Sequence, residues 1–187
     1  MKIVIRGGSI AAGYGVRQGY VDILTALYKQ EKHEVVNRSQ AGETSFDAVN
    51  SFYEDIAPLK PDILMLHFGI DDAFRSVYRS EFKENLVRIV RLAEVCLHTD
   101  VVLVTSHLLV NPVEMEAAHI YYRAIREVAV DLECTMIPVH TYWAGYLSDQ
   151  GLNPSDLLLQ DSRYPNERGH RVYAEAMAHW LANLYGM

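Results

Sequence analysis

Short apolar runs rich in β-branched residues alternate along this chain with longer stretches of helical period. This alternation constrains the fold most, because strands joined by helices pair in parallel and bury both faces of their sheet. The strands are predicted at 2–6, 33–37, 62–67, 101–105 and 135–139, and the helices at about 18–31, 45–58, 80–98, 113–132 and 166–185. The sequence therefore predicts a three-layer α/β, flavodoxin-like fold, with a five-stranded parallel sheet of order 2-1-3-4-5.

Size and charge narrow the classes of function. A chain of 187 residues fits a single domain, 1–187, and can bury roughly two-thirds of its unfolded surface. The formal charge of −7 disfavours a nucleic-acid surface, which needs a positive field around the phosphates. No segment approaches the ~20 apolar residues of a membrane span. The first strand follows directly after Met1 and Lys2, so we expect no signal peptide and a cytoplasmic location.

The two cysteines are expected to carry no chemistry. Cys96 lies in a helical pattern and Cys134 precedes a predicted strand. Two isolated cysteines in a chain of this length favour reduced, buried thiols over a disulfide or a metal site.

Glycine-rich and polar segments follow the predicted strands, at the edge where open parallel sheets bind their ligands. Ser9 follows the first strand in a turn of glycines, where a nucleophilic serine would lie beside free backbone N–H groups. Such a turn alone is also typical of an ordinary strand-to-helix connection or of a phosphate-binding loop. Residues 37–44 and 69–72 follow the second and third strands, and residues 161–166 precede the last helix. These four segments are expected to form one site.

In this order, the segments resemble the sequence blocks of the SGNH, or GDSL-type, hydrolase family over residues 3 to 170. Ser9 stands in the position of the family's nucleophile, and Gly8 replaces the aspartate of its Gly-Asp-Ser motif. Gly42 matches the glycine of the family's oxyanion hole. The resemblance implies a flavodoxin-like fold, hydrolysis of an ester or acyl bond, and no cofactor.

Two positions depart from the family pattern. The third block reads Gly-x-Asn-Asp in the family, with the asparagine donating to the oxyanion, and here Asp71 takes that position. The last block reads Asp-x-x-His, and here Asp161 matches the acid while Tyr164 replaces the histidine. The resemblance thus implies Ser9, Asp161 and Tyr164 as catalytic positions, with Gly42 and Asp71 as oxyanion or substrate-binding positions.

The aspartate in the third block changes the expected chemistry. A carboxylate has only acceptors and adds negative charge beside a developing oxyanion. Asp71 would therefore help only if it were protonated, or if it turned toward a cation such as Arg6, Arg38 or Arg163.

The tyrosine in the last block leaves the identity of the base open. A phenol with a pKa near 10 is mostly protonated at neutral pH, so Tyr164 either acts as a phenolate base or fills the space of the imidazole and donates to Asp161. Among the histidines, His107, which follows the fourth predicted strand, is the favoured replacement base.

Two further interpretations concern ligands. Asp71, Asp72, Asp161 and His67 could gather as metal ligands, although nothing in the sequence fixes their spacing. The predicted long loop 140–165, with one short helix near Tyr142–Tyr146, carries Tyr142 and Trp143, which would suit the wall of a pocket for a sugar or acyl group.

Two functions remain from the sequence. The first is a divergent serine hydrolase that acts on an ester or acyl bond of a small substrate, with atypical or weak catalysis. The alternative is a non-catalytic protein of the same fold that binds an acyl or carbohydrate ligand or a protein partner. No sequence feature sets the oligomeric state.

Overall fold

The computed structural model describes residues 1–187 and contains one five-stranded parallel sheet of order β2-β1-β3-β4-β5, which confirms the predicted topology. The strands are β1 (Lys2–Gly7), β2 (Glu34–Asn37), β3 (Ile63–His67), β4 (Asp100–Val104) and β5 (Thr135–Ile137). Parallel register runs through the sheet, with Ile5 of β1 opposite Asn37 of β2 and Met65 of β3. The carboxyl ends of all the strands therefore meet at one edge.

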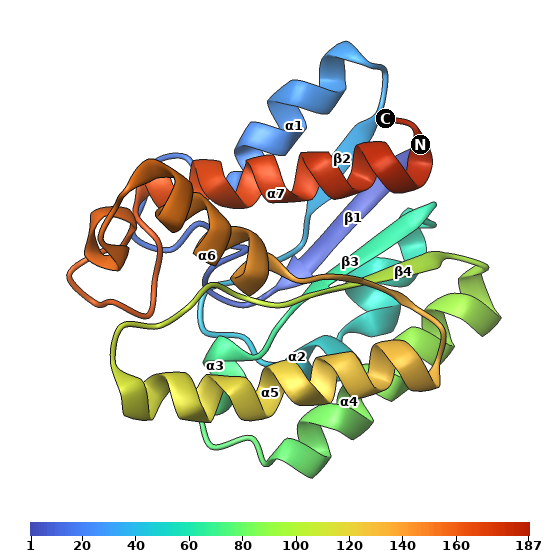
Figure 1. Ribbon diagram of the computed structural model, residues 1–187. Helices are drawn as coiled ribbons and strands as arrows, with labels where there is room; N and C mark the ends of the chain where they lie inside the picture. Colours follow the sequence, from blue (N-terminus) through green and yellow to red (C-terminus); the bar gives the residue numbers. More distant parts are fainter.

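Helices cover both faces of the sheet (Figure 1). They are α1 (Tyr20–Gln30), α2 (Ser45–Asn50), α3 (Ile70–Phe74), α4 (Arg79–Leu92), α5 (Pro112–Asp131), α6 (Val139–Gln150) and α7 (Glu167–Tyr185). Short irregular turns of helix occur at Phe52–Ile56, Ala57–Leu59, Ala93–Leu97 and Pro154–Leu157. Helices α1, α6 and α7 pack on one face, and α2, α4 and α5 pack on the other (Figure 1).

The strands alternate between two hydrophobic cores. Ile3 and Ile5 belong to the core beneath α1, α6 and α7, whereas Val4 between them belongs to the core beneath α2, α4 and α5. This alternation follows from the two-residue period of a strand, and continuous apolar runs are required because both faces are covered. In a helix the buried residues recur every three to four positions, and accordingly Leu24 and Tyr28 of α1, four residues apart, are both buried.

The largest difference from the predicted elements lies in the last third of the chain. The expected long loop 140–165 begins with α6, a helix of 12 residues that ends at Gly151 in a left-handed conformation (φ 60°). Gly145 lies within this helix, and a Cβ there would meet nothing within 4 Å, so the residue is tolerated on an open face. The buried positions Val139, Trp143 and Leu147 recur every four residues, which is the signal that identifies this helix.

Trp143 is fully buried, so the prediction that it forms part of a pocket wall is wrong. The cysteine expectation is also wrong in part: both thiols are free, but Cys96 is exposed and Cys134 is half-buried. None of the helices combines the length and the apolar character that crossing a membrane would require.

Candidate active site

Ser9 joins the ends of three neighbouring strands. It lies in the turn after β1, and its hydroxyl donates to Oδ1 of Asp71, after β3, at 2.7 Å. The backbone N–H of Gly42, after β2, donates to Ser9 Oγ at 2.8 Å. The Ser9 N–H donates to Oδ2 of Asp71 at 2.6 Å. Three residues that the sequence predicts to share a site thus share one hydrogen-bonded cluster.

The glycine at position 8 leaves room for this arrangement. A Cβ on Gly8 would lie 2.2 Å from Oδ2 of Asp71 and 2.6 Å from the carbonyl oxygen of Glu43. Any side chain there would displace the carboxylate or the backbone of the loop after β2. The glycine in place of the family's aspartate and the carboxylate of Asp71 therefore fit together as a pair.

Asp71 is 6 % exposed, and its carboxylate accepts hydrogen bonds from the hydroxyl and N–H groups of Ser9. It does not turn toward the cations considered for it. Arg6, which is fully buried, pairs with Glu43 and with Asp55 at 3.3 Å. Asp71 acts here as an acceptor from Ser9, whereas the asparagine of the family would donate.

Tyr164 lies over Ser9 and remains a phenol. Burial is the largest influence on its pKa and raises it above the ordinary value near 10; the charge of Asp71 raises it further, and contact with the Ser9 side chain lowers it only in part. The ring is also packed against Tyr14, with centroids 4.9 Å apart, and beneath the guanidinium of Arg163 at 5.8 Å. At neutral pH this group can donate a hydrogen bond but cannot accept a proton from Ser9.

Asp161 is not directed at the site in the way that a triad acid would be. Its carboxylate is bound by Arg163, with Nε to Oδ1 at 2.9 Å and Nη2 to Oδ2 at 2.6 Å, and its side chain is 41 % exposed. This pairing holds the pKa of Asp161 below its usual value. No hydrogen bond joins the carboxylate to the phenol of Tyr164, so the expected donation from Tyr164 to Asp161 is absent.

The favoured replacement base lies in the interior. His107 is fully buried, its Nδ1 is 2.8 Å from the Tyr173 hydroxyl, and its ring packs on Trp143. Burial, reinforced by neighbouring His170, lowers the pKa of His107 to about 3. None of its hydrogen bonds reaches Ser9, and neither do those of His67, which bonds Tyr20 and Ser106.

The candidate metal ligands do not gather. Asp72 accepts from the N–H groups of Ser45 and Gly69, which fixes the start of two short helices. Asp161 is held by Arg163, and no group of three or more potential ligands forms a cluster anywhere in the structure.

Sequence reasoning missed one member of the site. Tyr14 is half exposed and its ring packs against that of Tyr164 at a tilt of 57°, and its backbone N–H donates to the carbonyl oxygen of Ser9 at 3.0 Å. No motif or spacing identifies this residue, because its role depends on the path of the glycine turn.

Ser9 is almost completely covered, with 3 % of its surface exposed. A void beside Asp71, which His67 and Ser106 also border but Ser9 does not, has a volume of about 10 Å³ and suits at most one water molecule. A substrate can therefore reach the Ser9 hydroxyl only after the covering side chains move.

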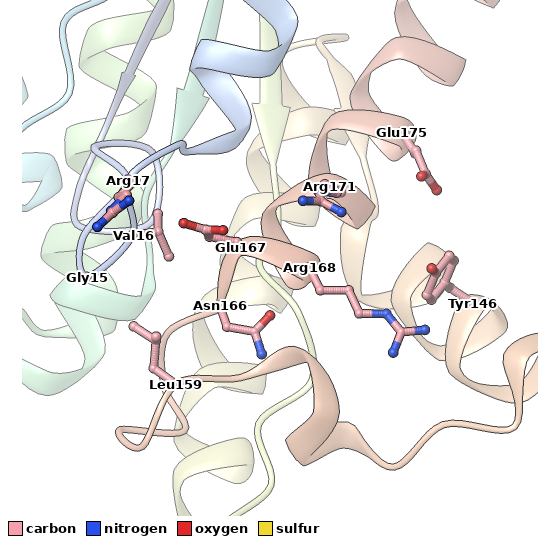
Figure 2. A pocket seen from close by; sticks show the side chains of 10 residues that line it. All are labelled: Gly15, Val16, Arg17, Tyr146, Leu159, Asn166, Glu167, Arg168, Arg171 and Glu175. Atoms are coloured by element: carbon pink, nitrogen blue, oxygen red, sulfur yellow. The ribbon is translucent and has the colours of Figure 1, made fainter.

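The largest hollow lies elsewhere and is polar. A groove of about 1030 Å³ runs between the loop at Gly15 and the first half of α7, and Ser9 is not among the residues that line it. Figure 2 shows Glu167 pointing toward the loop that carries Arg17, and Arg168 reaching toward Tyr146 of α6. The mixture of three arginines and two glutamates suits a polar ligand better than an apolar one.

Known proteins resemble this chain in sequence pattern and in fold. The model of the GDSL-like lipase/acylhydrolase family matches residues 6–172. No curated protein matches the chain significantly. The structure of Axe2, an acetylxylan esterase from Geobacillus stearothermophilus, aligns with a TM-score of 0.81 and 22 % identity over 95 % of this chain and 92 % of that one.

A second solved structure is similar to the same degree. LAE5, an alpha/beta hydrolase enzyme from the metagenome of Lake Arreo, Spain, aligns with a TM-score of 0.81 and 25 % identity over 95 % of this chain and 93 % of that one. Three of the matching Axe2 structures are catalytic mutants in which a serine, an aspartate or a histidine is replaced by alanine.

Proposed function

Because this chain belongs to the GDSL-like lipase/acylhydrolase family, we propose that it hydrolyses an ester or acyl bond of a small substrate with Ser9 as the nucleophile. The observation that supports this most is the position of Ser9 Oγ, which accepts from Gly42 N–H at 2.8 Å and donates to Asp71 at 2.7 Å. A serine becomes a nucleophile when an adjacent base can take its proton.

In this proposal Asp71 is that base. The Ser9 proton moves to Oδ1 of Asp71 while Oγ bonds to the acyl carbon, and the carbonyl oxygen becomes the oxyanion. The transfer makes Asp71 a neutral carboxyl group, so its charge no longer opposes the oxyanion. Asp71 then returns the proton to the leaving alcohol. A water molecule then gives a proton to Asp71 as its oxygen bonds to the acyl carbon, and Asp71 returns that proton to Ser9 Oγ as the bond between Oγ and the acyl carbon breaks and the acid leaves.

Donors to the oxyanion come from the backbone and from the phenol. The N–H groups of Gly42 and Ser9 now bond Ser9 Oγ and Asp71 Oδ2, and in this proposal they turn to the oxyanion once Ser9 is acylated and Asp71 is protonated. The Tyr164 hydroxyl, kept protonated by burial, adds a third donor. Relative to the family pattern, the base and the side-chain donor have exchanged positions. A carboxylate is a weaker base than an imidazole, so we expect slow turnover.

Asp161 has a positioning role in this proposal. Its ion pair with Arg163 holds the guanidinium over Phe74, at 5.2 Å, and over Tyr164. The pair thus fixes the phenol above Ser9 without contact with the reacting atoms.

The substrate proposed is a short acyl ester of a polar molecule, such as an acetylated carbohydrate. The void beside Asp71 is too small for a long acyl chain, and the large groove bordered by Arg17 and Glu167 is polar. The name of Axe2, an acetylxylan esterase, is in keeping with this class of substrate.

Binding without chemistry is the second candidate function. It is favoured by the near-complete burial of Ser9 and by the Asp71 carboxylate, which occupies the Ser9 N–H that an oxyanion would need.

Steady-state hydrolysis of p-nitrophenyl acetate, butyrate and octanoate separates the two functions. We expect slow hydrolysis of the acetate by the native protein, none by Ser9→Ala, and a rate about 10²- to 10⁴-fold lower in Asp71→Asn, because a general base contributes about that much. Ser148→Ala, on the exposed side of α6, is the matched control and keeps the native rate. Equal rates in the native protein and Ser9→Ala would contradict the proposal, and absence of any turnover would favour the binding function.

A further inference from the structure

A second pocket, of about 400 Å³, lies between α5 and the start of α6 and shares no residue with the Ser9 cluster. His119, Arg123 and Arg126 of α5 border it, together with His140 of α6. None of its eight lining residues is an aspartate or a glutamate. In a chain with a formal charge of −7, this pocket concentrates cationic and titratable nitrogens and has no acidic residue in its lining.

The two arginines of this pocket are free of protein partners. Neither Arg123 nor Arg126 forms an ion pair or a side-chain hydrogen bond, although both also border a smaller hollow with Glu127 and Asp131. Those two carboxylates are each bound to Lys83 of α4 at 3.1 Å. Both of these acids are therefore engaged by another helix, and both guanidinium groups keep their donors available for a ligand.

The floor of the pocket is fixed. The Tyr122 hydroxyl donates to the carbonyl oxygen of His107 at 2.7 Å, which holds its ring. The His140 ring stacks on Tyr122 with centroids 5.3 Å apart, and its Nδ1 is 2.7 Å from the Thr105 hydroxyl. The His119 ring meets the edge of the same tyrosine at 6.0 Å. One imidazole is thus oriented by two contacts, and its Nε2 has no partner in the protein.

We infer that this pocket binds the phosphate group of a small phosphorylated molecule. Two guanidinium groups offer forked donors that match phosphate oxygens, and an oriented imidazole beside them can donate from Nε2. A phosphomonoester dianion fits these three groups better than a single carboxylate does. The volume of about 400 Å³ is that of a small-molecule site, and the acidic charge of the whole chain disfavours a nucleic acid.

Calorimetric titration of the full chain tests this inference at constant ionic strength and neutral pH. The probes are inorganic phosphate, glycerol 3-phosphate and acetate. We expect one saturable site for both phosphates and at least about tenfold weaker binding of acetate. In Arg123→Gln/Arg126→Gln, the affinity for both phosphates should fall at least about tenfold, because each charge-assisted hydrogen bond is worth about that factor.

Arg168→Gln/Arg171→Gln is the matched control, since it removes two arginines from the large polar groove and leaves the α5–α6 pocket intact. Its affinity for phosphate should equal that of the native protein. Stronger binding of inorganic phosphate than of glycerol 3-phosphate would indicate a site for the free ion and overturn the assignment to a phosphorylated molecule. Non-saturable binding, equal binding of acetate, or equal losses in the two double variants would overturn the site itself.

Discussion

Replacing Asp71 by asparagine and Tyr164 by histidine in the same chain should raise kcat/KM for p-nitrophenyl acetate at least about 10²-fold over the native protein. The introduced imidazole would take the Ser9 proton with a pKa near neutrality, and the introduced amide would donate to the oxyanion where Asp71 now accepts from Ser9. The measurement is steady-state hydrolysis with the same substrates for all variants.

The single variants decide which group is the base in the native protein. Asp71→Asn alone should lower the rate, since it removes the proposed base, and yet the same change should be favourable once histidine is present. If the effect of Asp71→Asn on the rate changes sign in this way, the residues at positions 71 and 164 are coupled, as expected for two groups that act on the same proton. A rise in rate from Asp71→Asn alone would mean that the native carboxylate only obstructs the oxyanion hole. No gain in the double variant would mean that Arg163 keeps Asp161 from orienting the imidazole.

Lowering the pH from about 6 to about 4.5 should cost the folded protein about 4 kcal/mol of stability. Burial lowers the pKa of His67 and of His107 to about 3 and that of His170 to about 4, in each case as the first cause. In the unfolded chain these side chains bind protons below about pH 6.5. Above that pH the histidines are neutral in both states and do not oppose folding. As the pH falls below it, they bind protons in the unfolded chain but not in the folded protein, so the free energy of unfolding decreases.

Asp72 makes the opposite contribution to the pH dependence of stability. Burial raises its pKa to about 6, so it binds a proton in the folded state before it does so in the unfolded chain, and it contributes stability as the pH falls from about 6 toward about 4. The unfolded chain therefore binds about three more histidine protons than the folded protein and about one fewer aspartate proton. This net difference of about two protons lowers the free energy of unfolding by ~2.7 kcal/mol for each pH unit of acidification. Since domains of this kind are stable by about 5–15 kcal/mol, the effect is large.

Urea unfolding followed by tryptophan fluorescence at several pH values measures this slope. His170→Asn keeps an acceptor for the Tyr20 N–H, which His170 Nδ1 now accepts at 3.2 Å, and should reduce the slope by about one proton. His179→Asn, on the exposed side of α7, is the matched control and should leave the slope unchanged. Stability that stays constant between about pH 6 and 4.5 would contradict the assignment of neutral, buried histidines.

The fold and the convergence of the site were predictable from local pattern. Continuous apolar runs separated by helical stretches allow a covered parallel sheet, and parallel strands bring Ser9, Gly42 and Asp71 to one edge. The resemblance to SGNH hydrolases is confirmed by the family match over residues 6–172.

The contacts within the site were less predictable, because they depend on competition between nearby groups. Asp71 accepts from Ser9 only because Gly8 leaves its oxygen room, and a motif does not show that space. Asp161 pairs with Arg163, two residues away, instead of reaching Tyr164.

The positions of His107 and of the helix before the last loop depend on tertiary packing. His107 follows β4 directly, but the chain turns inward there and the Tyr173 hydroxyl binds its ring. The glycines of the segment 140–165 suggested a loop, whereas burial of Trp143 stabilises α6. Tertiary contacts outweighed local propensity at both places.

The central claim is that the Ser9 hydroxyl is an activated nucleophile whose proton passes to Asp71, and the most direct test is covalent labelling with a fluorophosphonate. Intact-mass and peptide analysis of the native protein, Ser9→Ala and Asp71→Asn would locate and time the adduct. We predict one adduct on the peptide that contains Ser9, none in Ser9→Ala, and labelling about 10²-fold slower in Asp71→Asn. A native protein that stays unlabelled, or labelling of Asp71→Asn at or above the native rate, would contradict the claim.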